Sequence, residues 1–374
     1  MNSKIILLVL ALITTLGCEK ANKKQVQENK TYSFFVGTYT DGDSQGIYKY
    51  SLQKDGKLSL NGLAAISDNP SFLTKSTDSK YLIAVNEISN KDTVGSAESF
   101  LIQSDTLKLI NRSSSGGAHP CFVTVNEAGY VLTANYTGGN VGLLQLNSQG
   151  ELTGLLDLQQ HSGSNTTDRQ KGPHAHSTWF TPKNNDVISV DLGTNELWFS
   201  KLDTEAQKLV PSNPNTLAME PGAGPRHLTF HPNGQWLYVV NELNGTVTLV
   251  EKTIAGAYQK KGSVSTLPVD YNKPNSCADI HISSDGKFLY VSNRGHNSIA
   301  IFKVSSDDGA LTLVAHEATR GDGPRNFSLT PDENFLLVAN QHSNNIISFK
   351  RNTATGLLEY VDEIKAPTPV CILF

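Results

Sequence analysis

Alternating apolar and polar residues recur from residue 32 to the end of the chain, in short stretches separated by glycine, proline, asparagine and aspartate. Alternation with a period of two is typical of half-buried β-strands. Pro232-Asn233-Gly234 and Ser284-Asp285-Gly286 lie between such stretches and predict the tight turns of β-hairpins. The repeated stretches show no helical period, so the pattern predicts an all-β fold.

The predicted strands are organised in seven similar units. Each unit begins at an anchor residue, and the anchors are Pro70, Pro120, Pro173, Pro225, Cys277, Pro324 and Pro369, spaced 45 to 53 residues apart. After the anchor we expect a strand A, a turn, an apolar strand B such as WLYVVN, a strand C such as GTVTLVE and a variable strand D. Several alternating strands in every repeat predict a seven-bladed β-propeller rather than a solenoid.

The two ends of the chain each supply part of one unit. From Pro369 onward only PVCILF remains, which is enough for one strand. Residues 34–52 resemble strands B and C of a unit that lacks its strand A. We therefore predict that the terminal segments pair within one blade and close the ring, because closure removes the free edges of an open sheet.

The first residues predict export from the cytoplasm. Lys4 precedes an apolar run over residues 5–13, and small residues follow, as in a secretory signal peptide. The segment resembles a bacterial lipoprotein signal, which implies a signal peptide over residues 1–17 and lipidation of Cys18. The alternative is ordinary secretion, in which Cys18 has no such role.

Residues 18–31 are polar without an apolar period and predict a flexible tether from the acylated cysteine to a propeller domain of residues 32–374. Two or three acyl chains hold a protein to a membrane where one does not. We expect an exported lipoprotein, anchored in the periplasm or at the outer membrane.

The net charge of −4 gives no reason to expect nucleic acid as a partner. We also expect the protein to be a monomer.

Three cysteines remain in the predicted mature domain: Cys121, Cys277 and Cys371. Their number is odd and their spacing matches no zinc pattern. We predict buried free thiols, and neither a metal nor another cofactor.

Polar residues concentrate at two kinds of strand end. Strand B returns antiparallel to strand A, so the start of A and the end of B lie on one face of the disc. Strand A is innermost, so these residues are expected to ring the mouth of the central channel. The starts of A supply His119, Cys121, His174, His176, Arg226, His227, Asp279 and Arg325, and the ends of B supply Glu87, Tyr136, Glu242, Arg294 and Gln341.

An asparagine or aspartate closes strand B in six units, at Asn86, Asn135, Asp191, Asn241, Asn293 and Asn340. A residue that recurs in the blades is expected to bond the loop backbone, so we assign it a structural role. Residues that depart from the repeat are better functional candidates. Glu87, Glu242 and Arg294 directly follow the recurring position, where other units carry Tyr, Leu or Gln. Their alternative role is in salt bridges between blades.

The starts of strand A add cations and imidazoles. The hairpin is expected to bring Arg226 close to Glu242. His174 and His176 are two residues apart and are expected to point the same way, as ligand or base, or as hydrogen-bonded channel residues. His119, His227, Glu87, Tyr136 and Arg325 are the candidates for substrate binding. His161, His231 and His316 fall in loops or turns and are expected to be solvated.

The segments VGTYT, GAHPCFV, ANYTGGNV, GPHAHS, GPRHLTFHPNGQWLYVVNE, VSNRGHNSI and GPRNFSLTPD together resemble those of the seven-bladed β-propeller lactonase family. This family contains the propeller-type 6-phosphogluconolactonases and the fungal carboxy-cis,cis-muconate lactonizing enzymes. The resemblance covers residues 32–374. It implies catalytic groups at His174 or His176, Arg226, Glu242 and Arg294.

The expected activity is hydrolysis of a sugar-derived lactone, a carboxylic ester hydrolase reaction. Glu242, His174 or His176 is expected to deprotonate the attacking water. One of Arg226 and Arg294 then stabilises the oxyanion while the other holds an anionic substituent of the lactone or sugar acid. Two alternatives stay open, namely a cycloisomerase of the carboxy-muconate type and a propeller that binds a ligand or protein without catalysis.

Overall fold

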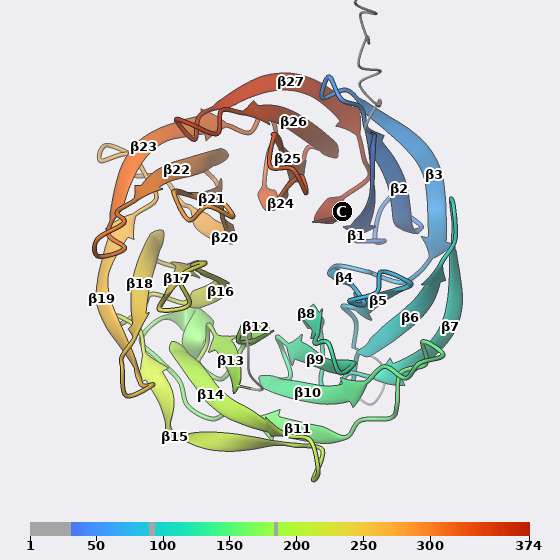
Figure 1. Ribbon diagram of the computed structural model, residues 1–374, viewed down its shortest axis with the longest axis vertical. Coiled ribbons are helices and arrows are strands. Elements are labelled where there is room, and N and C mark those ends of the chain that lie inside the picture. Colours follow the sequence, from blue (N-terminus) through green and yellow to red (C-terminus); the bar gives the residue numbers. More distant parts are fainter. Residues whose placement is uncertain (1–30, 90–93, 183–185) are drawn as a thin grey trace, which may run out of the picture.

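The chain forms a disc of β-sheets arranged around a central channel (Figure 1). The computed structural model describes residues 31–89, 94–182 and 186–374. Within these residues the strands form seven four-stranded antiparallel sheets, one for each predicted unit, and the predicted seven-bladed β-propeller is confirmed. The predicted signal peptide and Cys18 lie outside the described residues.

The blades follow the order of the chain, and the strands of each blade lie in sequence from the channel outward. Blade 1 contains β28 (Pro369–Leu373), β1 (Tyr32–Thr38), β2 (Gly46–Leu52) and β3 (Leu58–Ile66); blade 2 contains β4 (Leu73–Lys75), β5 (Tyr81–Asn86), β6 (Ser96–Ile102) and β7 (Leu107–Ser114); blade 3 contains β8 (Pro120–Val125), β9 (Tyr130–Asn135), β10 (Asn140–Gln145) and β11 (Asp157–Gln160). Blade 4 contains β12 (Ala175–Phe180), β13 (Asp186–Asp191), β14 (Glu196–Asp203) and β15 (Lys208–Ala218); blade 5 contains β16 (Pro225–Phe230), β17 (Trp236–Asn241), β18 (Thr246–Lys252) and β19 (Tyr258–Ser265). Blade 6 contains β20 (Ser276–Ile282), β21 (Phe288–Arg294), β22 (Ser298–Val304) and β23 (Leu311–Ala318); blade 7 contains β24 (Pro324–Leu329), β25 (Phe335–Asn340), β26 (Asn345–Arg351) and β27 (Leu358–Lys365).

The last strand of the chain closes the ring. β28 pairs antiparallel with β1, with Phe35 opposite Leu373 and Val36 opposite Ile372. Figure 1 shows the C-terminus beside β1, on the channel side of blade 1. The predicted closure by the two terminal segments is therefore confirmed.

Closure should depend on the apolar side chains of β28. Ile372 is 5% exposed and packs in a cluster that spans blades 1 and 7. We expect Ile372→Ala to lower the free energy of unfolding by about 2–5 kcal/mol, because it leaves a cavity at the closing seam. Leu60→Ala, on β3 of the same blade, is the control, since Leu60 is 53% exposed. Urea unfolding of both variants checks this, and equal midpoints would contradict it.

The hydrophobic core lies between the blades rather than at the centre of the disc. The described residues form seven buried apolar clusters, and each cluster combines side chains from two neighbouring blades. In one of them, Tyr238 of β17 shares a cluster with Phe302 of β22. This packing between neighbouring blades holds the disc together.

A β-bulge marks the start of most innermost strands. Pro225 pairs with Asn241 but His227 pairs with Val240, so Arg226 is an extra residue in its strand. Equivalent extra residues are Cys121, His176 and Arg325. A bulge re-aims a side chain and breaks strict alternation. His174 precedes β12 and His176 lies in the bulge, so the alternation on which their common direction was predicted does not apply to them.

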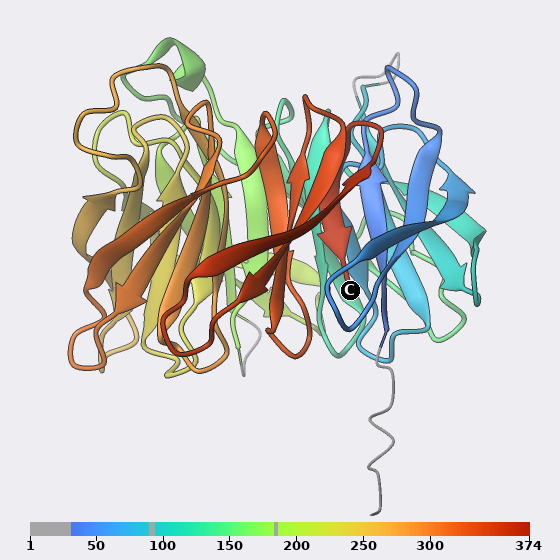
Figure 2. The same cartoon turned by 90° about the horizontal axis from the view of Figure 1, so that it is seen from above.

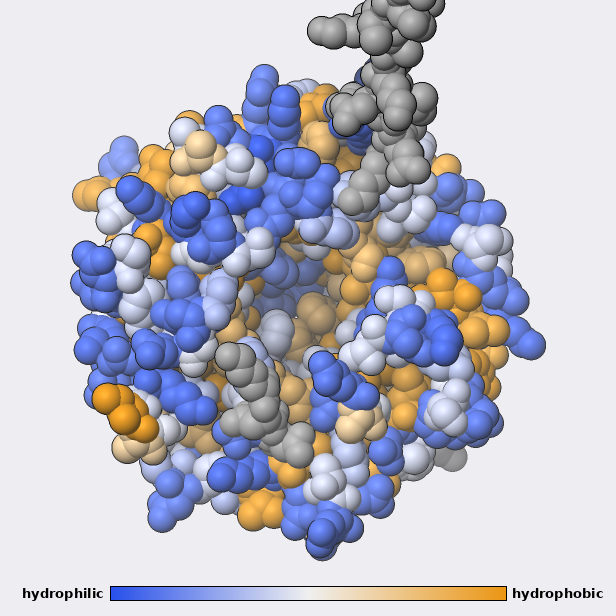
Figure 3. Space-filling view, viewed as in Figure 1, coloured by the Kyte–Doolittle hydropathy of each residue, from blue (hydrophilic) through white to orange (hydrophobic). Residues whose placement is uncertain are grey.

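The two faces of the disc differ. We call the face where the innermost strands begin the site face. The short 3₁₀-helix η1 (Asp168–Gln170), green in Figure 2, lies at this face. Figure 3 shows the opposite face, which carries the turns between strands A and B and is hollowed at its centre.

Candidate active site

Glu242 binds three guanidinium groups at the site face. Its Oε2 accepts a hydrogen bond from Arg226 Nε at 3.1 Å and lies 2.9 Å from Arg294 Nη2. Its Oε1 accepts from Arg169 Nη2 at 3.1 Å. We call Glu242, Arg169, Arg226 and Arg294 the carboxylate–arginine cluster. The hairpin brings Arg226 and Glu242 together as predicted, and the Arg294 contact is also an ion pair between blades 5 and 6.

Glu242 is an anion at neutral pH. Burial raises the pKa of Glu242, but Arg294, Arg226 and the other nearby guanidiniums lower it further, to about 2. Burial, together with Arg294 and Arg325, lowers the pKa of Arg226 to about 10. One negative charge therefore faces three positive charges, and the cluster has an excess of about two positive charges at neutral pH.

The side chains of the cluster differ in their access to solvent. The side chains of Arg226 and Glu242 are 3% and 5% exposed, that of Arg294 is 17% exposed and that of Arg169 is 52% exposed. Arg226 is also held by Ala278, whose carbonyl accepts from Nη1 at 2.6 Å. Arg169 and Arg294 are thus the cations of this cluster that can face a substrate, while Arg226 is buried.

Arg169 was not a candidate from the sequence. It lies on η1, in the connection between β11 and β12. That connection covers residues 161–174, whereas residues 219–224 suffice between β15 and β16. The unusual length of this connection, which leads into the GPHAHS motif, is the sequence feature that could have pointed to Arg169.

His174 is linked to the cluster through Tyr136. The two rings are stacked, with centroids 4.5 Å apart. His174 Nδ1 lies 3.0 Å from the carbonyl oxygen of Tyr136, so Nδ1 carries the proton and Nε2 is the accepting nitrogen. The Tyr136 hydroxyl accepts from Arg169 Nη2 at 2.8 Å. Asp191 Oδ1 accepts from the backbone N–H of His174 at 2.8 Å and fixes the start of the strand.

His176 lies deeper than His174. It is 5% exposed, and its ring contacts those of Tyr136 and His227 edge to face. Burial and the charge of Arg226 hold the pKa of His176 well below its usual range. Cys121 Sγ lies 3.7 Å from His176 Nδ1, and burial raises the pKa of this thiol, so Cys121 is not an activated nucleophile.

His227 belongs to a buried network in the channel wall. Its Nδ1 donates to Asp279 Oδ1 at 2.9 Å, and His281 Nε2 lies 3.0 Å from Asp279 Oδ2. Burial raises the pKa of Asp279, but His281 and His227 lower it below its usual range. Burial and Arg226 lower the pKa of His227 to about 4, so this imidazole is neutral at physiological pH.

Tyr39, Glu87 and Arg325 form a second polar group, the Tyr39 cluster. The Tyr39 hydroxyl donates to Glu87 Oε2 at 2.8 Å and accepts from Arg325 Nη2 at 2.7 Å. Glu87 and Arg325 line a cavity of about 10 Å³ together with Arg226, which is room for about one water molecule. The two clusters are therefore neighbours within the channel.

The other polar candidates have structural partners. His119 Nδ1 lies 2.9 Å from Thr137 Oγ1. The expectation that His161 is solvated was wrong, because it is buried, stacks on Trp198 and lies 2.7 Å from Asp191 Oδ2. His231 and His316 are half-buried, with Gly286 and Thr266 carbonyl partners.

The recurring residue at the end of strand B is structural. The side-chain amides of Asn86, Asn135, Asn293 and Asn340 donate to the loop carbonyls of Asp68, Ser115, Thr266 and Thr319. The prediction of a structural role is confirmed at these positions. The prediction of buried free thiols at Cys121, Cys277 and Cys371 is confirmed as well.

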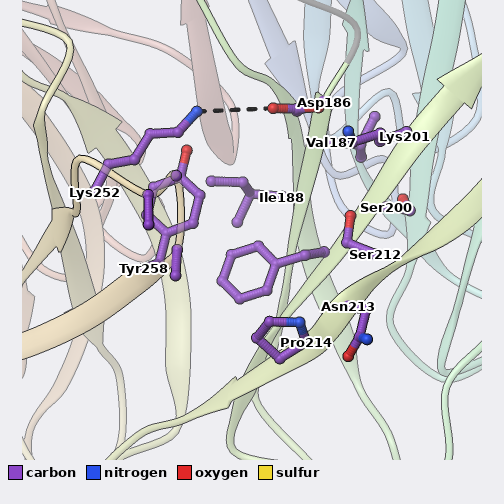
Figure 4. Close-up of a pocket in the computed structure, with 14 residues that line it drawn as sticks. Asp186, Val187, Ile188, Ser200, Lys201, Ser212, Asn213, Pro214, Lys252 and Tyr258 are labelled. Carbon is purple, nitrogen blue, oxygen red and sulfur yellow. Dashed lines mark ion pairs between the residues drawn. The ribbon is translucent and has the colours of Figure 1, made fainter.

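A larger cavity, of about 350 Å³, lies outside the channel, between the outer strands of blades 4 and 5 (Figure 4). Lys252 and Asp186 face each other across it at 3.8 Å, and the Phe199 and Tyr258 rings stack. Its 14 lining residues include no histidine or arginine, and none of them belongs to the predicted site. Across the described chain no His, Cys, Asp and Glu side chains group as a metal site would need, and no helix is long and apolar enough to span a membrane.

Known proteins are similar to this chain in sequence and fold. The chain is 36% identical over 349 residues to the 6-phosphogluconolactonase of Bacillus subtilis, covering 92% of this chain and 98% of the relative. It is 37% identical over 312 residues to the 6-phosphogluconolactonase of Formosa agariphila, covering 79% and 86%. The structure of the periplasmic gluconolactonase of Pseudomonas aeruginosa superposes with a TM-score of 0.87 at 30% identity, covering 92% and 98%.

The match extends over the whole described propeller. The family model described as "Lactonase, 7-bladed beta-propeller" matches residues 33–374. These residues contain all seven blades, the carboxylate–arginine cluster and the Tyr39 cluster. The chain belongs to the seven-bladed β-propeller lactonase family.

Proposed function

We propose that this protein is a lactonase that hydrolyses a sugar-derived lactone at the site face of the channel. The observation that carries the proposal is the combination of an oriented histidine with an excess of guanidinium charge. His174 presents an accepting Nε2, and Tyr136 links it to Arg169 of the carboxylate–arginine cluster. General-base activation of water and stabilisation of an oxyanion are the two requirements of ester hydrolysis.

His174 is the base in this mechanism. Its Nε2 takes a proton from water as the water oxygen attacks the lactone carbonyl carbon. The carbonyl oxygen becomes an oxyanion, and a guanidinium of the cluster stabilises it. When the ring C–O bond breaks, the imidazolium returns the proton to the leaving ring oxygen, and the product is a hydroxy acid. The mechanism uses no covalent nucleophile and no cofactor.

Glu242 and Arg226 support the reaction without exchanging protons. Both oxygens of Glu242 are engaged by guanidinium groups and its pKa is about 2, which makes it a weak base at neutral pH. Arg226 is buried and holds Glu242 in place. Arg294 is more exposed than Arg226, the other arginine predicted as catalytic, and is assigned to the oxyanion. His176 is a buried support for Tyr136 and His227.

The relatives bear on the substrate and the compartment. Two are named 6-phosphogluconolactonase and one is named a periplasmic gluconolactonase. We propose that this protein is exported, anchored through lipid on Cys18, monomeric, and active on a lactone outside the cytoplasm. Phosphorylated and unphosphorylated gluconolactone are the two substrates to compare.

An assay panel tests the proposal. Purified protein is mixed with gluconolactone, its 6-phosphate and carboxy-muconate, and spontaneous hydrolysis is subtracted. We expect turnover of at least one gluconolactone at kcat/KM of about 10⁴ M⁻¹s⁻¹ or more. Turnover of carboxy-muconate alone would show a cycloisomerase. Binding without turnover would show a propeller that is not an enzyme.

A further inference from the structure

The exposed guanidinium of Arg169 has capacity beyond its protein contacts. Its Nη2 makes the hydrogen bonds to Glu242 and Tyr136. A guanidinium group carries five N–H donors in a planar fork. The Arg169 side chain is 52% exposed, so the remaining edge of the fork is open to a ligand at the site face.

The loop that carries Arg169 is firmly held. The side chain of Gln170 is buried, and its Nε2 donates to the Leu192 carbonyl at 2.9 Å and to Asn195 Oδ1 at 3.1 Å. Asn165 Oδ1 accepts from Gly222 N at 3.1 Å, which ties the loop to the next blade connection. These contacts at Asn165 and Gln170 hold the loop that carries Arg169 against the propeller.

The charge of the cluster calls for an anionic ligand. Glu242 neutralises one of the three guanidiniums that bind it, and burial makes the remaining repulsion costly. A phosphate or carboxylate on the substrate would offset this repulsion. Arg169 has the most exposed side chain of the three.

We propose that Arg169 is a specificity-determining residue that binds an anionic substituent, phosphate or carboxylate, of the lactone. This inference rests on the proposed function. It separates the roles of the exposed cations: Arg294 acts on the carbonyl oxygen that every lactone shares, and Arg169 recognises a group that only some lactones carry. The Tyr136 hydroxyl and Glu242 orient its fork.

The test compares Arg169→Gln with wild type on gluconolactone, its 6-phosphate and the corresponding 6-carboxylate lactone. We expect kcat/KM on an anionic lactone to fall about 10- to 100-fold, as for a lost hydrogen bond to a charged group, mainly through KM. Activity on neutral gluconolactone should fall by a smaller factor, because this substrate lacks the group that Arg169 binds. The anionic lactone that loses most identifies phosphate or carboxylate as the group.

Lys171→Gln is the matched control. Lys171 lies two positions along the same loop and pairs with exposed Asp168 at 3.2 Å, so its loss removes the same charge outside the cluster. Equal losses on neutral and anionic lactones in Arg169→Gln, or losses that match Lys171→Gln, would overturn the inference.

Calorimetry separates this inference from the proposed function. Inorganic phosphate should bind wild type and Lys171→Gln about tenfold more tightly than Arg169→Gln. If wild type hydrolyses no lactone but phosphate binding depends on Arg169, the proposed function fails and the anion site stands. If lactones are hydrolysed but phosphate binding does not depend on Arg169, the anion site fails alone.

Discussion

Glu242→Gln is expected to inactivate the protein and to destabilise it. The substitution removes the anion that holds three guanidinium groups together. Arg226 is then a buried cation without its partner, and breaking a buried pair is strongly destabilising. From the lowering of the Glu242 pKa to about 2 we expect a loss of about 3 kcal/mol at pH 7. We expect kcat/KM to fall by about 10²-fold or more, because Arg294 loses its ion pair and is then oriented only by the Ser276 and Cys277 carbonyls.

The stability that Glu242→Gln loses should become smaller as the pH is lowered. The pKa of Glu242 is lower in the folded protein than in the unfolded chain. Its contribution is therefore complete above the unfolded pKa and is lost as pH falls toward about 2. Urea unfolding of wild type and Glu242→Gln should differ by a constant amount above pH 5 and converge in acid. A difference independent of pH would contradict the ion-pair account.

A second buried carboxylate separates stability from activity. Glu98 has a 2% exposed side chain and accepts from Arg112 Nε at 3.0 Å, but it lies outside both clusters. Glu98→Gln should also destabilise the fold, while kcat/KM stays within about twofold of wild type, as for a substitution remote from the reacting groups. Equal activity losses in the two variants would show that Glu242 acts only through stability.

The fold could be predicted from the sequence because its information is repeated. Alternation within each unit, the anchors at Pro225 and Pro324, and the turn residues all favour the same four-stranded blade. The incomplete last unit predicted the pairing of β28 with β1. The strand and turn preferences of each segment agree with the structure that the repeat predicts, and such consistency favours a single fold.

The candidate site could be predicted only where it follows the repeat. Arg226 and Glu242 lie on one hairpin, so their contact follows from strand pairing. Arg169 reaches the same carboxylate from a connection between blades, and its position depends on the buried amide of Gln170, which no periodic pattern reveals. A bulge likewise leaves no periodic signal, which is why the direction of His176 was predicted from an alternation that does not hold there.

Replacing His174 with asparagine is expected to remove the general base. We expect kcat/KM to fall by about 10²–10⁴-fold, the usual contribution of general-base catalysis. A general base acts in its unprotonated form, so kcat/KM of the wild type should fall as the pH is lowered. His174→Asn should lose this dependence. Rates are measured between pH 5 and 8 by titration of the acid released, with spontaneous hydrolysis subtracted.

Two further measurements decide between a base and a support for the Tyr136 ring. Added imidazole should restore part of the activity of His174→Asn, because a small base can enter the space that the side chain leaves, whereas a lost stacking contact would not be restored. His231→Asn is the control, since His231 follows β16 at the opposite face and bonds the Gly286 carbonyl. A His174→Asn variant that keeps the wild-type pH profile would exclude His174 as the base and leave the buried, neutral His176 as the remaining imidazole beside Tyr136.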